Sequence, residues 1–419
     1  MPAANRRVVD SRRGGGGRRS MGVAMLSAMR TRADDRPRPR HHRAPGAVLS
    51  WVLPGVATVV WALVVTTGHS WGRVTAHWAS AVTMLGGSFL AGSSPEGGGA
   101  VAFPVFTKVL HVSPAVARTF GLSIQAVGMT MAVVAIVVNR RRLHLPTALV
   151  ASLSAVVGFG LTLAVAGRHD LVFWPARFGV AWVKATFSVL LAGTSVLMIR
   201  HLRRGPHHHL DPPWGPRPAL VVALVALAGG GLSALAGTGA NIVVFLLLVV
   251  VFGVHPKVAL PTAILVMAVV SLVGLGVLGV LDGQLDVVVA ADRVVSVGGR
   301  PVELAASSAD LWGLWMAAVP VVVWGAPLGS WAAARVREAT LVGFVAVLAA
   351  TEVVTTCILV PELRHDPRLI AYLVGGLVAV PALFVWAERR AEALVGRPAV
   401  PSLAGPGPPG LGAGDGEQG

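Results

Sequence analysis

The sequence predicts an all-α protein that crosses a membrane many times. Hydrophobic residues make up 54% of the 419 residues, charged residues make up only 13%, and the mean hydropathy is +0.71. Several apolar runs reach the roughly 20 residues that a helix needs to cross a bilayer core of about 30 Å. Two further apolar regions are interrupted by glycine-rich breaks. Together these observations predict about eight full transmembrane helices and two re-entrant, broken helical hairpins.

Uninterrupted apolar runs between charged loops define the full spans. We place these spans at residues 46–67, 118–138, 145–166, 172–199, 258–281, 311–334, 340–360 and 369–388. The two interrupted regions are residues 79–110, broken between Gly92 and Gly99, and residues 218–252, broken between Gly237 and Asn241. Helix-breaking backbone at membrane depth needs a protein-lined or watery cavity, so each break is a candidate site.

The charges of the loops orient the chain. Twelve arginines precede Ala44, and basic clusters follow several spans, at Arg140–Arg142, Arg200–Arg204, Arg335–Arg337 and Arg389–Arg390. Lys and Arg gather on the cytoplasmic side of membrane proteins. All of these clusters fall on that side only if both interrupted regions return to the side from which they enter. Both termini are then cytoplasmic, and the two hairpins enter from opposite sides.

An internal repeat accompanies this topology. At an offset of 142 residues, Val112-Ser113-Pro114-Ala115-Val116-Ala117 is aligned with Val254-His255-Pro256-Lys257-Val258-Ala259. The same offset pairs Gly87 with Gly229, and Gly97 with Gly239. Because the hairpins enter from opposite sides, we expect two inverted repeats, a common plan of secondary transporters.

The chain therefore divides into repeats with flanking segments. We expect an Arg-rich cytoplasmic tail at 1–45, an extra helix and loop at 46–78, a first repeat at 79–204, a Pro/His-rich cytoplasmic linker at 205–217, a second repeat at 218–360, an extra helix at 361–390 and a Pro/Gly-rich tail at 391–419. The oligomeric state, and the choice of start residue among Met1, Met21 and Met25, stay open.

Charge and residue usage exclude several functions. The net charge of +16 arises mainly from the first tail and the short loops, which is typical of membrane topology and anionic lipid contact and not of nucleic-acid binding. A single cysteine, Cys357, excludes an intrachain disulfide and a multi-cysteine metal site. The histidines fall in tails, loops and span ends, and no P-loop pattern occurs. We expect no enzyme activity, no cofactor and no bound metal.

The motifs of the two copies resemble those of the TauE/SafE family of sulfite and organosulfonate exporters. The first copy reads Pro95-Glu96-Gly97-Gly98-Gly99, followed by Val112 to Thr119, and the second reads Gly237-Thr238-Gly239-Ala240-Asn241, followed by Gly253 to Thr262. The segment Gly325-Ala326-Pro327-Leu328-Gly329 is also similar to the family pattern. The resemblance covers roughly residues 79–360 and implies export of a small sulfur-containing anion. Glu96, Ala240 and Asn241 depart from the family pattern.

The breaks are the expected substrate site. A helix N-terminus binds an anion through its free N–H groups and the positive end of its dipole. The arms that begin near Gly97 and Gly239 present such ends, which we expect to meet near the bilayer midplane. The candidate substrate-binding residues are Ser93, Ser94, Glu96, Gly97, Gly98, Gly99, Thr238, Gly239, Ala240 and Asn241. The alternative is that the glycines only allow close helix packing.

Charged residues inside the spans supply further candidates. Glu96 is a candidate proton carrier, because an ionisable group at membrane depth is usually functional; the alternative is a structural carboxyl at the hairpin turn. Lys184 and Glu352 form a possible buried ion pair. Arg118, Lys108 and Lys257 are expected at the interfaces, as anchors or to attract anions, and Gln125 and Ser271 are weaker site candidates.

The preferred function is a secondary transporter of a small sulfur-containing anion, with proton coupling open and with export as the usual direction in the family. One alternative is a transporter of a carboxylate or a metal ion. Another is a non-transporting membrane subunit that binds a partner through its tails.

Overall fold

The computed structural model describes residues 45–110, 112, 114–166, 180–204, 214–286, 295–297, 300–302 and 310–395. The expected tail at 1–45, except Pro45, most of the linker at 205–217 and the C-terminal tail from residue 396 lie outside this set. Contacts between Cα atoms group residues 46–419 as one unit, and the description below concerns that unit.

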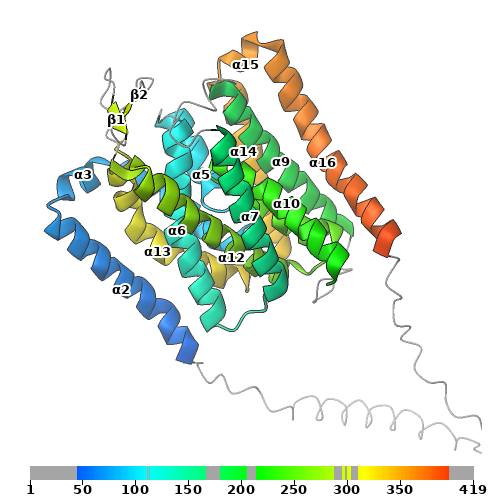
Figure 1. Cartoon of the computed structure of the whole chain (residues 1–419), viewed down its shortest axis with the longest axis horizontal. Helices are drawn as coiled ribbons and strands as arrows, with labels where there is room; N and C mark the ends of the chain where they lie inside the picture. The colour runs from blue at the N-terminus through cyan, green and yellow to red at the C-terminus, as the bar shows by residue number, and fades with distance from the viewer. Residues whose placement is uncertain are drawn as a thin grey trace, which may run out of the picture. The chain divides into compact units, whose positions relative to one another are not determined.

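The described elements are almost entirely helical (Figure 1). The long helices are α2 (Pro45–Thr67), α4 (Trp78–Ser93), α6 (Pro114–Val138), α7 (Leu145–Ala166), α9 (Val180–Arg204), α10 (Pro216–Ala236), α12 (Pro256–Gly274), α13 (Leu311–Ala333), α14 (Glu338–Leu359) and α16 (Pro367–Val395). The short elements are α3 (Trp71–Ala76), α5 (Gly99–Pro104), α11 (Ala240–Leu246), α15 (Glu362–His365), the π-helices η1 (Val105–Val109), η2 (Leu247–Val251) and η3 (Leu275–Leu281), the 3₁₀ turn η4 (Gln284–Asp286), and the strands β1 (Val295–Val297) and β2 (Arg300–Val302).

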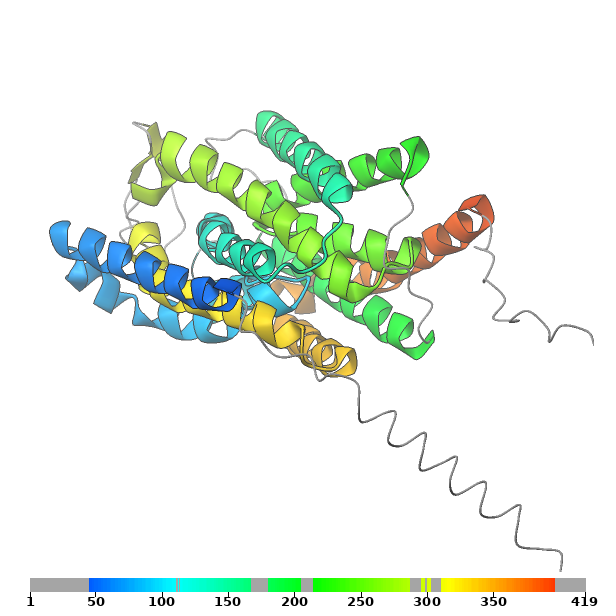
Figure 2. The same cartoon turned by 90° about the horizontal axis from the view of Figure 1, so that it is seen from below.

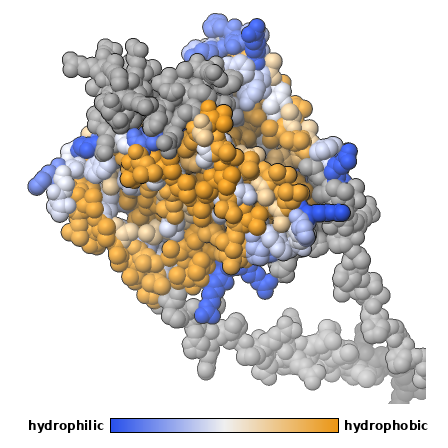
Figure 3. Space-filling view, viewed as in Figure 1, coloured by the Kyte–Doolittle hydropathy of each residue, from blue (hydrophilic) through white to orange (hydrophobic). Residues whose placement is uncertain are grey.

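The predicted all-α, multi-pass membrane class is confirmed. Within the described part of the chain, nine helices are long and apolar enough to cross a membrane. The additional one is α10, which the sequence predicted as the short first arm of a hairpin. Large apolar side chains face outward, such as Leu153 at 70% exposure and Leu281 at 77%, and hydrophobic residues dominate the face shown in Figure 3. Such a surface is stable only in lipid.

The repeat of 142 residues is visible in the backbone. Each broken arm ends in a five-residue π-helix, η1 and η2, whose bounds differ by this offset. The N–H of Val112 donates to Phe106 O at 2.8 Å, and the corresponding N–H of Val254 donates to Leu248 O at 2.8 Å. A proline then begins each following span, α6 and α12. The matching hydrogen bonds show that the two copies share a local fold as well as a sequence pattern.

Each first arm packs against a long helix of the other half of the chain. Arm α4 lies along α13, where a Cβ added at Gly92 would collide with the carbonyl oxygen of Ala326. Arm α10 lies along α7, where a Cβ at Gly230 would collide with the carbonyl oxygen of Ala155. Such close approach of backbones is the usual role of glycine between transmembrane helices. Because each first arm packs on a helix of the other half of the chain, the two breaks are held close together.

The two extra helices flank this arrangement (Figures 1 and 2). Helix α2 lies beside α13, and the indole N–H of Trp61 donates to Met316 O at 2.8 Å. Helix α16 lies beside α9, where Val380 packs against Gly193. It continues to Val395, past the predicted end of the span at residue 388. The extra helices therefore cover the outside of the repeats and leave the breaks between them.

Asp310 fixes the start of α13. Its carboxylate accepts from the Gly313 N–H at 3.0 Å as an N-cap and pairs with Arg73 at 2.6 Å. Burial alone would raise the pKa of this carboxyl, but hydrogen bonds from His77, Arg73 and the Gly313 N–H together hold the pKa well below its ordinary value. This contact ties the segment after α2 to α13.

Candidate functional site

The two glycine-rich breaks lie against each other. The hydroxyl of Thr238 in the second break is 3.4 Å from the carbonyl oxygen of Glu96 in the first. A Cβ added at Gly99 would lie 3.3 Å from the side chain of Thr238. The candidate residues from the two repeats therefore form one cluster, which we call the break site, made of the ten predicted substrate-binding residues.

Glycine is required where the chain turns between the arms. Gly97, Gly237 and Gly239 have φ values of +73°, +77° and +146°, which L side chains rarely adopt. A Cβ at Gly97 would also lie 3.1 Å from Asn241 Nδ2 and 3.2 Å from Gln125 Oε1. Any side chain at residue 97 would thus fill the space between these two amide groups.

Some predicted donors are already bonded within the fold. The hydroxyls of Ser93 and Ser94 donate back to Phe89 O at 2.8 Å and Leu90 O at 3.1 Å. The Ala240 N–H at the start of α11 donates to Ser233 Oγ at 2.9 Å. These three groups support the backbone of the break site, and a ligand would have to compete with their bonds.

Other polar atoms of the break site, and one of Gln125 beside it, have no hydrogen-bond partner among the described residues. They are both carboxylate oxygens of Glu96, Gln125 Oε1 and Asn241 Nδ2. The three side chains are 0%, 1% and 1% exposed. A buried polar atom without a partner costs about 1–3 kcal/mol, so three such side chains in one place indicate a site built for something other than stability. Of these, Gln125 was only a weaker candidate from the sequence, yet its Nε2 donates to Gly237 O at 3.1 Å.

A cation lies next to the second break. Nη1 of Arg118 is 3.4 Å from Ala234 O, at the end of α10, and a Cβ on Gly237 would lie 2.5 Å from Arg118 O. Nε of Arg118 is buried and has no hydrogen-bond partner in the described part of the chain. Arg118, expected from the sequence at an interface, lies beside the second break, and the carboxylate of Asp282 interacts with its charge.

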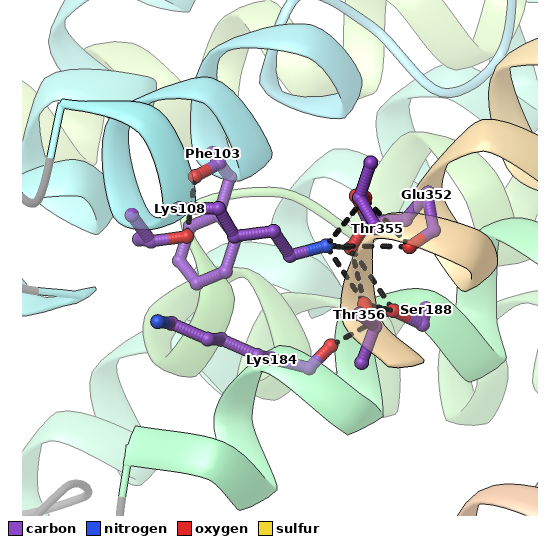
Figure 4. Close-up of polar contacts among 8 residues, drawn as sticks. Phe103, Lys108, Lys184, Ser188, Glu352, Thr355 and Thr356 are labelled. Carbon is purple, nitrogen blue, oxygen red and sulfur yellow. Dashed lines mark hydrogen bonds and ion pairs between the residues drawn. The ribbon is translucent and has the colours of Figure 1, made fainter. Parts of the chain in front are cut away.

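A second polar cluster lies between η1, α9 and α14 (Figure 4). Nζ of Lys108 is 2.6 Å from Glu352 Oε1 and 2.7 Å from Thr356 Oγ1. The hydroxyl of Ser188 donates to the same carboxylate oxygen at 2.9 Å. Both charged side chains of the ion pair are 2% exposed. We call these four residues, with Thr355, the ion-pair cluster.

The ion-pair cluster corrects two predictions. The predicted partner of Glu352 was Lys184, but the carboxylate pairs with Lys108, and Figure 4 shows the Lys184 ammonium directed away from it. Lys108 was expected at an interface, but it is buried. The reason is that η1 continues the broken arm into the protein and carries Lys108 to α14. A lysine within the apolar arm from Val101 to Leu110 was the signal that could have indicated this.

Comparison with known proteins supports this picture at the level of the family. No curated protein and no solved structure was found to match the chain. A sequence profile described as "Sulfite exporter TauE/SafE" matches residues 79–356. The match contains both breaks, the π-helices η1, η2 and η3 and the ion-pair cluster, and it leaves α2 and α16 outside. Because the match covers more than half of the chain, the protein belongs to the TauE/SafE family of membrane transporters.

Proposed function

We propose that this protein is a secondary transporter that carries a small sulfur-containing anion, such as sulfite or an organosulfonate, across the cytoplasmic membrane. The observation that carries the proposal is the contact of two symmetry-related breaks, at Glu96 and Thr238, around buried polar atoms that have no partner among the described residues. A site between repeats that enter from opposite sides is the usual plan for alternating access.

The charges near the break site favour an anion as the substrate. Arg118 supplies a positive charge beside the second break, and the broken arms α5–η1 and α11–η2 begin at the breaks, where the positive ends of their dipoles lie. The side-chain amide of Asn241 adds a donor without a partner among the described residues. A metal ion would need several oxygen ligands around it, and Glu96 supplies the one carboxylate of the break site.

Glu96 is the proposed coupling residue. An ionised carboxylate in the break site would repel an anion, whereas a protonated one is neutral and donates a hydrogen bond. Proton binding at Glu96 and anion binding at the neighbouring amides would then favour each other. Since Thr238 occupies the equivalent position of the second repeat and does not titrate, the proposal predicts one proton site per transport cycle.

The topology supports the proposed orientation. Among the described residues, the long helices between the two hairpins are α6, α7 and α9, and this odd number supports entry of the hairpins from opposite sides. With the basic clusters inside, the first hairpin enters from the outside and both termini are cytoplasmic.

The test is flux into proteoliposomes that contain the full-length protein. We expect uptake of at least one anion from a panel of sulfite, thiosulfate, short sulfonates and carboxylates, with a rate that depends on a pH gradient. Uptake of carboxylates alone would favour the alternative substrate class, and no flux of any of these anions would contradict the proposal.

A variant without residues 1–44 and 396–419 distinguishes a transporter from a binding subunit. We expect it to retain flux, because both breaks and all helices of crossing length are intact. No measurable flux in either form, together with loss of partner binding in the shortened variant, would favour the binding subunit.

A further inference from the structure

A cavity of about 290 Å³ lies where the end of α6, the start of α12 and the end of α13 come together. Its lining includes residues that are exposed, such as Arg142, Lys257 and Ala334, so the cavity is reached from the surface. The loop between α6 and α7 forms one wall and the first turns of α12 form another. None of the ten break-site residues lines it.

The mouth of the cavity is basic. Arg141, Arg142, His255 and Lys257 line it, and among the described lining residues none is acidic. Arg141 is held in place, because its Nη1 donates to Ser330 O at 2.5 Å. Burial and, after it, the nearby charge of Arg335 lower the pKa of Arg141, so a further cation lies close to this side chain. Clefts lined by one sign of charge concentrate ions of the opposite sign.

The inner end of the cavity reaches the first hairpin. Gly92 lies in its lining, in the last turn of α4 and one residue before Ser93 of the break site. Apolar residues, including Pro261 and Ile264 of α12, form the wall between the basic mouth and this end. The cavity therefore leads from a cationic surface toward the break site.

The corresponding position of the other repeat is filled by the chain itself. The repeat offset pairs Pro261 with Thr119, whose hydroxyl donates to Gln284 Oε1 at 2.7 Å. Thr119 and Gln284 are 0% and 1% exposed. The chain thus covers α6 where the cavity borders α12, and the two repeats differ at this position.

We propose that the cavity is an anion-loading vestibule that opens to the cytoplasm, the first site that a small oxoanion or a short sulfonate meets on its way to the break site. Arg142 and Lys257 attract the anion, and the apolar wall takes up any short organic part. The proposal rests on the proposed function, which supplies the cytoplasmic side of the cavity and the route to the break site. The anion then enters the protein from the arginine-rich face.

Thiol labelling tests the vestibule without any measurement of transport. In full-length protein in membrane vesicles, with Cys357→Ala to remove the only cysteine, a single thiol is introduced by Ala333→Cys in the lining. The probes are two membrane-impermeant methanethiosulfonates of similar size, one with a sulfonate and one with a quaternary ammonium group. The control is Ala339→Cys, at an exposed position outside the cavity lining. It gives the ratio of the labelling rates of the two reagents at a thiol that does not line the vestibule.

We expect the sulfonate reagent to be favoured at Ala333→Cys by about tenfold relative to Ala339→Cys, since several positive charges face the cavity. Adding Arg142→Gln and Lys257→Gln, both at exposed positions, should remove most of this preference. A millimolar short alkylsulfonate, which does not react with methanethiosulfonates or disulfides as sulfite does, should slow the labelling. Labelling should occur in inside-out vesicles and not in intact cells.

Two results would overturn the proposal. One is an equal preference for the sulfonate reagent at Ala333→Cys and Ala339→Cys that Arg142→Gln and Lys257→Gln do not change. The other is protection by phosphatidylglycerol in the vesicles and none by the short alkylsulfonate, which would assign the basic residues to a lipid headgroup. Absence of flux in proteoliposomes with normal labelling would contradict the proposed function and leave the vestibule in place.

Discussion

The hydroxyl of Thr238 lies 3.4 Å from the carbonyl oxygen of Glu96, the residue that precedes it by one repeat of 142 residues. Equivalent positions of two repeats meet only near the axis that relates them, so this contact marks the centre of the proposed symmetry. The two side chains at this point differ, because one carries a titratable group and the other does not. The centre of the molecule is thus the place where the repeats diverge in chemistry.

Glu96→Gln should separate transport from the pH gradient. A glutamine keeps the size and the hydrogen-bonding capacity of a neutral glutamic acid but cannot exchange a proton. If one proton accompanies each anion, a gradient of one pH unit changes accumulation by up to about tenfold. We expect this dependence in the wild type and its loss in the variant, measured in proteoliposomes. Thr238→Val is the matched control at the equivalent position, and retained pH dependence in Glu96→Gln would refute proton coupling through this residue.

Gly97→Ala should damage the break site. The φ of +73° costs an L residue roughly 1–2 kcal/mol, and the added Cβ would lie 2.8 Å from Met129 Cε. We expect a lower midpoint of thermal unfolding in detergent and a large loss of anion flux. Gly86→Ala in α4 is the control, since a Cβ there meets no atom within 4 Å. Equal effects of the two changes on unfolding and flux would show that the positive φ and close contacts of Gly97 do not require glycine.

Lys108→Met should destabilise the protein far more than Lys184→Met. Removal of one partner of a buried ion pair leaves an uncompensated charge and costs about 3–5 kcal/mol. Of the two lysines, Lys108 forms the ion pair with the carboxylate of Glu352, at 2.6 Å. The double change Lys108→Met with Glu352→Met should recover most of the stability, as measured by thermal unfolding in detergent. A larger effect of Lys184→Met would instead favour the pairing predicted from the sequence.

Asp310 predicts acid sensitivity at the start of α13. Because its pKa is lowered in the folded state, its contribution is fully present above the ordinary carboxyl pKa and is lost as the pH falls through the lower value. Asp310→Ala removes the N-cap and the bond to Arg73 and should cost about 1–3 kcal/mol near neutral pH. Asp310→Asn keeps the cap and removes the charge, so its loss should be smaller and should show less dependence on acid. Identical pH profiles of thermal unfolding for wild type and Asp310→Asn would contradict this assignment.

Long-range features of this fold were readable from the sequence because each depends on a local property. Apolar length gives the spans, and the glycines of residues 97 and 239 mark the breaks because few other residues tolerate their backbone angles. The exception was α10, predicted as a short arm although residues 216–236 form one long helix. Gly229, Gly230 and Gly231 lie within this helix and pack closely against other atoms, as Gly230 does against α7.

The sequence by itself determined the membrane class, the repeat of 142 residues, the family and the identity of the break residues, because these follow from hydropathy, spacing and glycine. Only the tertiary structure decided which side chains face one another. In the structure Lys108 pairs with Glu352, and Gln125 and Arg118 lie beside the break site. The hydroxyls of Ser93 and Ser94 donate to backbone carbonyls of α4. The physical reason is that partners more than 100 residues apart are selected by helix packing, and the direction in which an arm carries its side chains is not encoded in its apolar pattern.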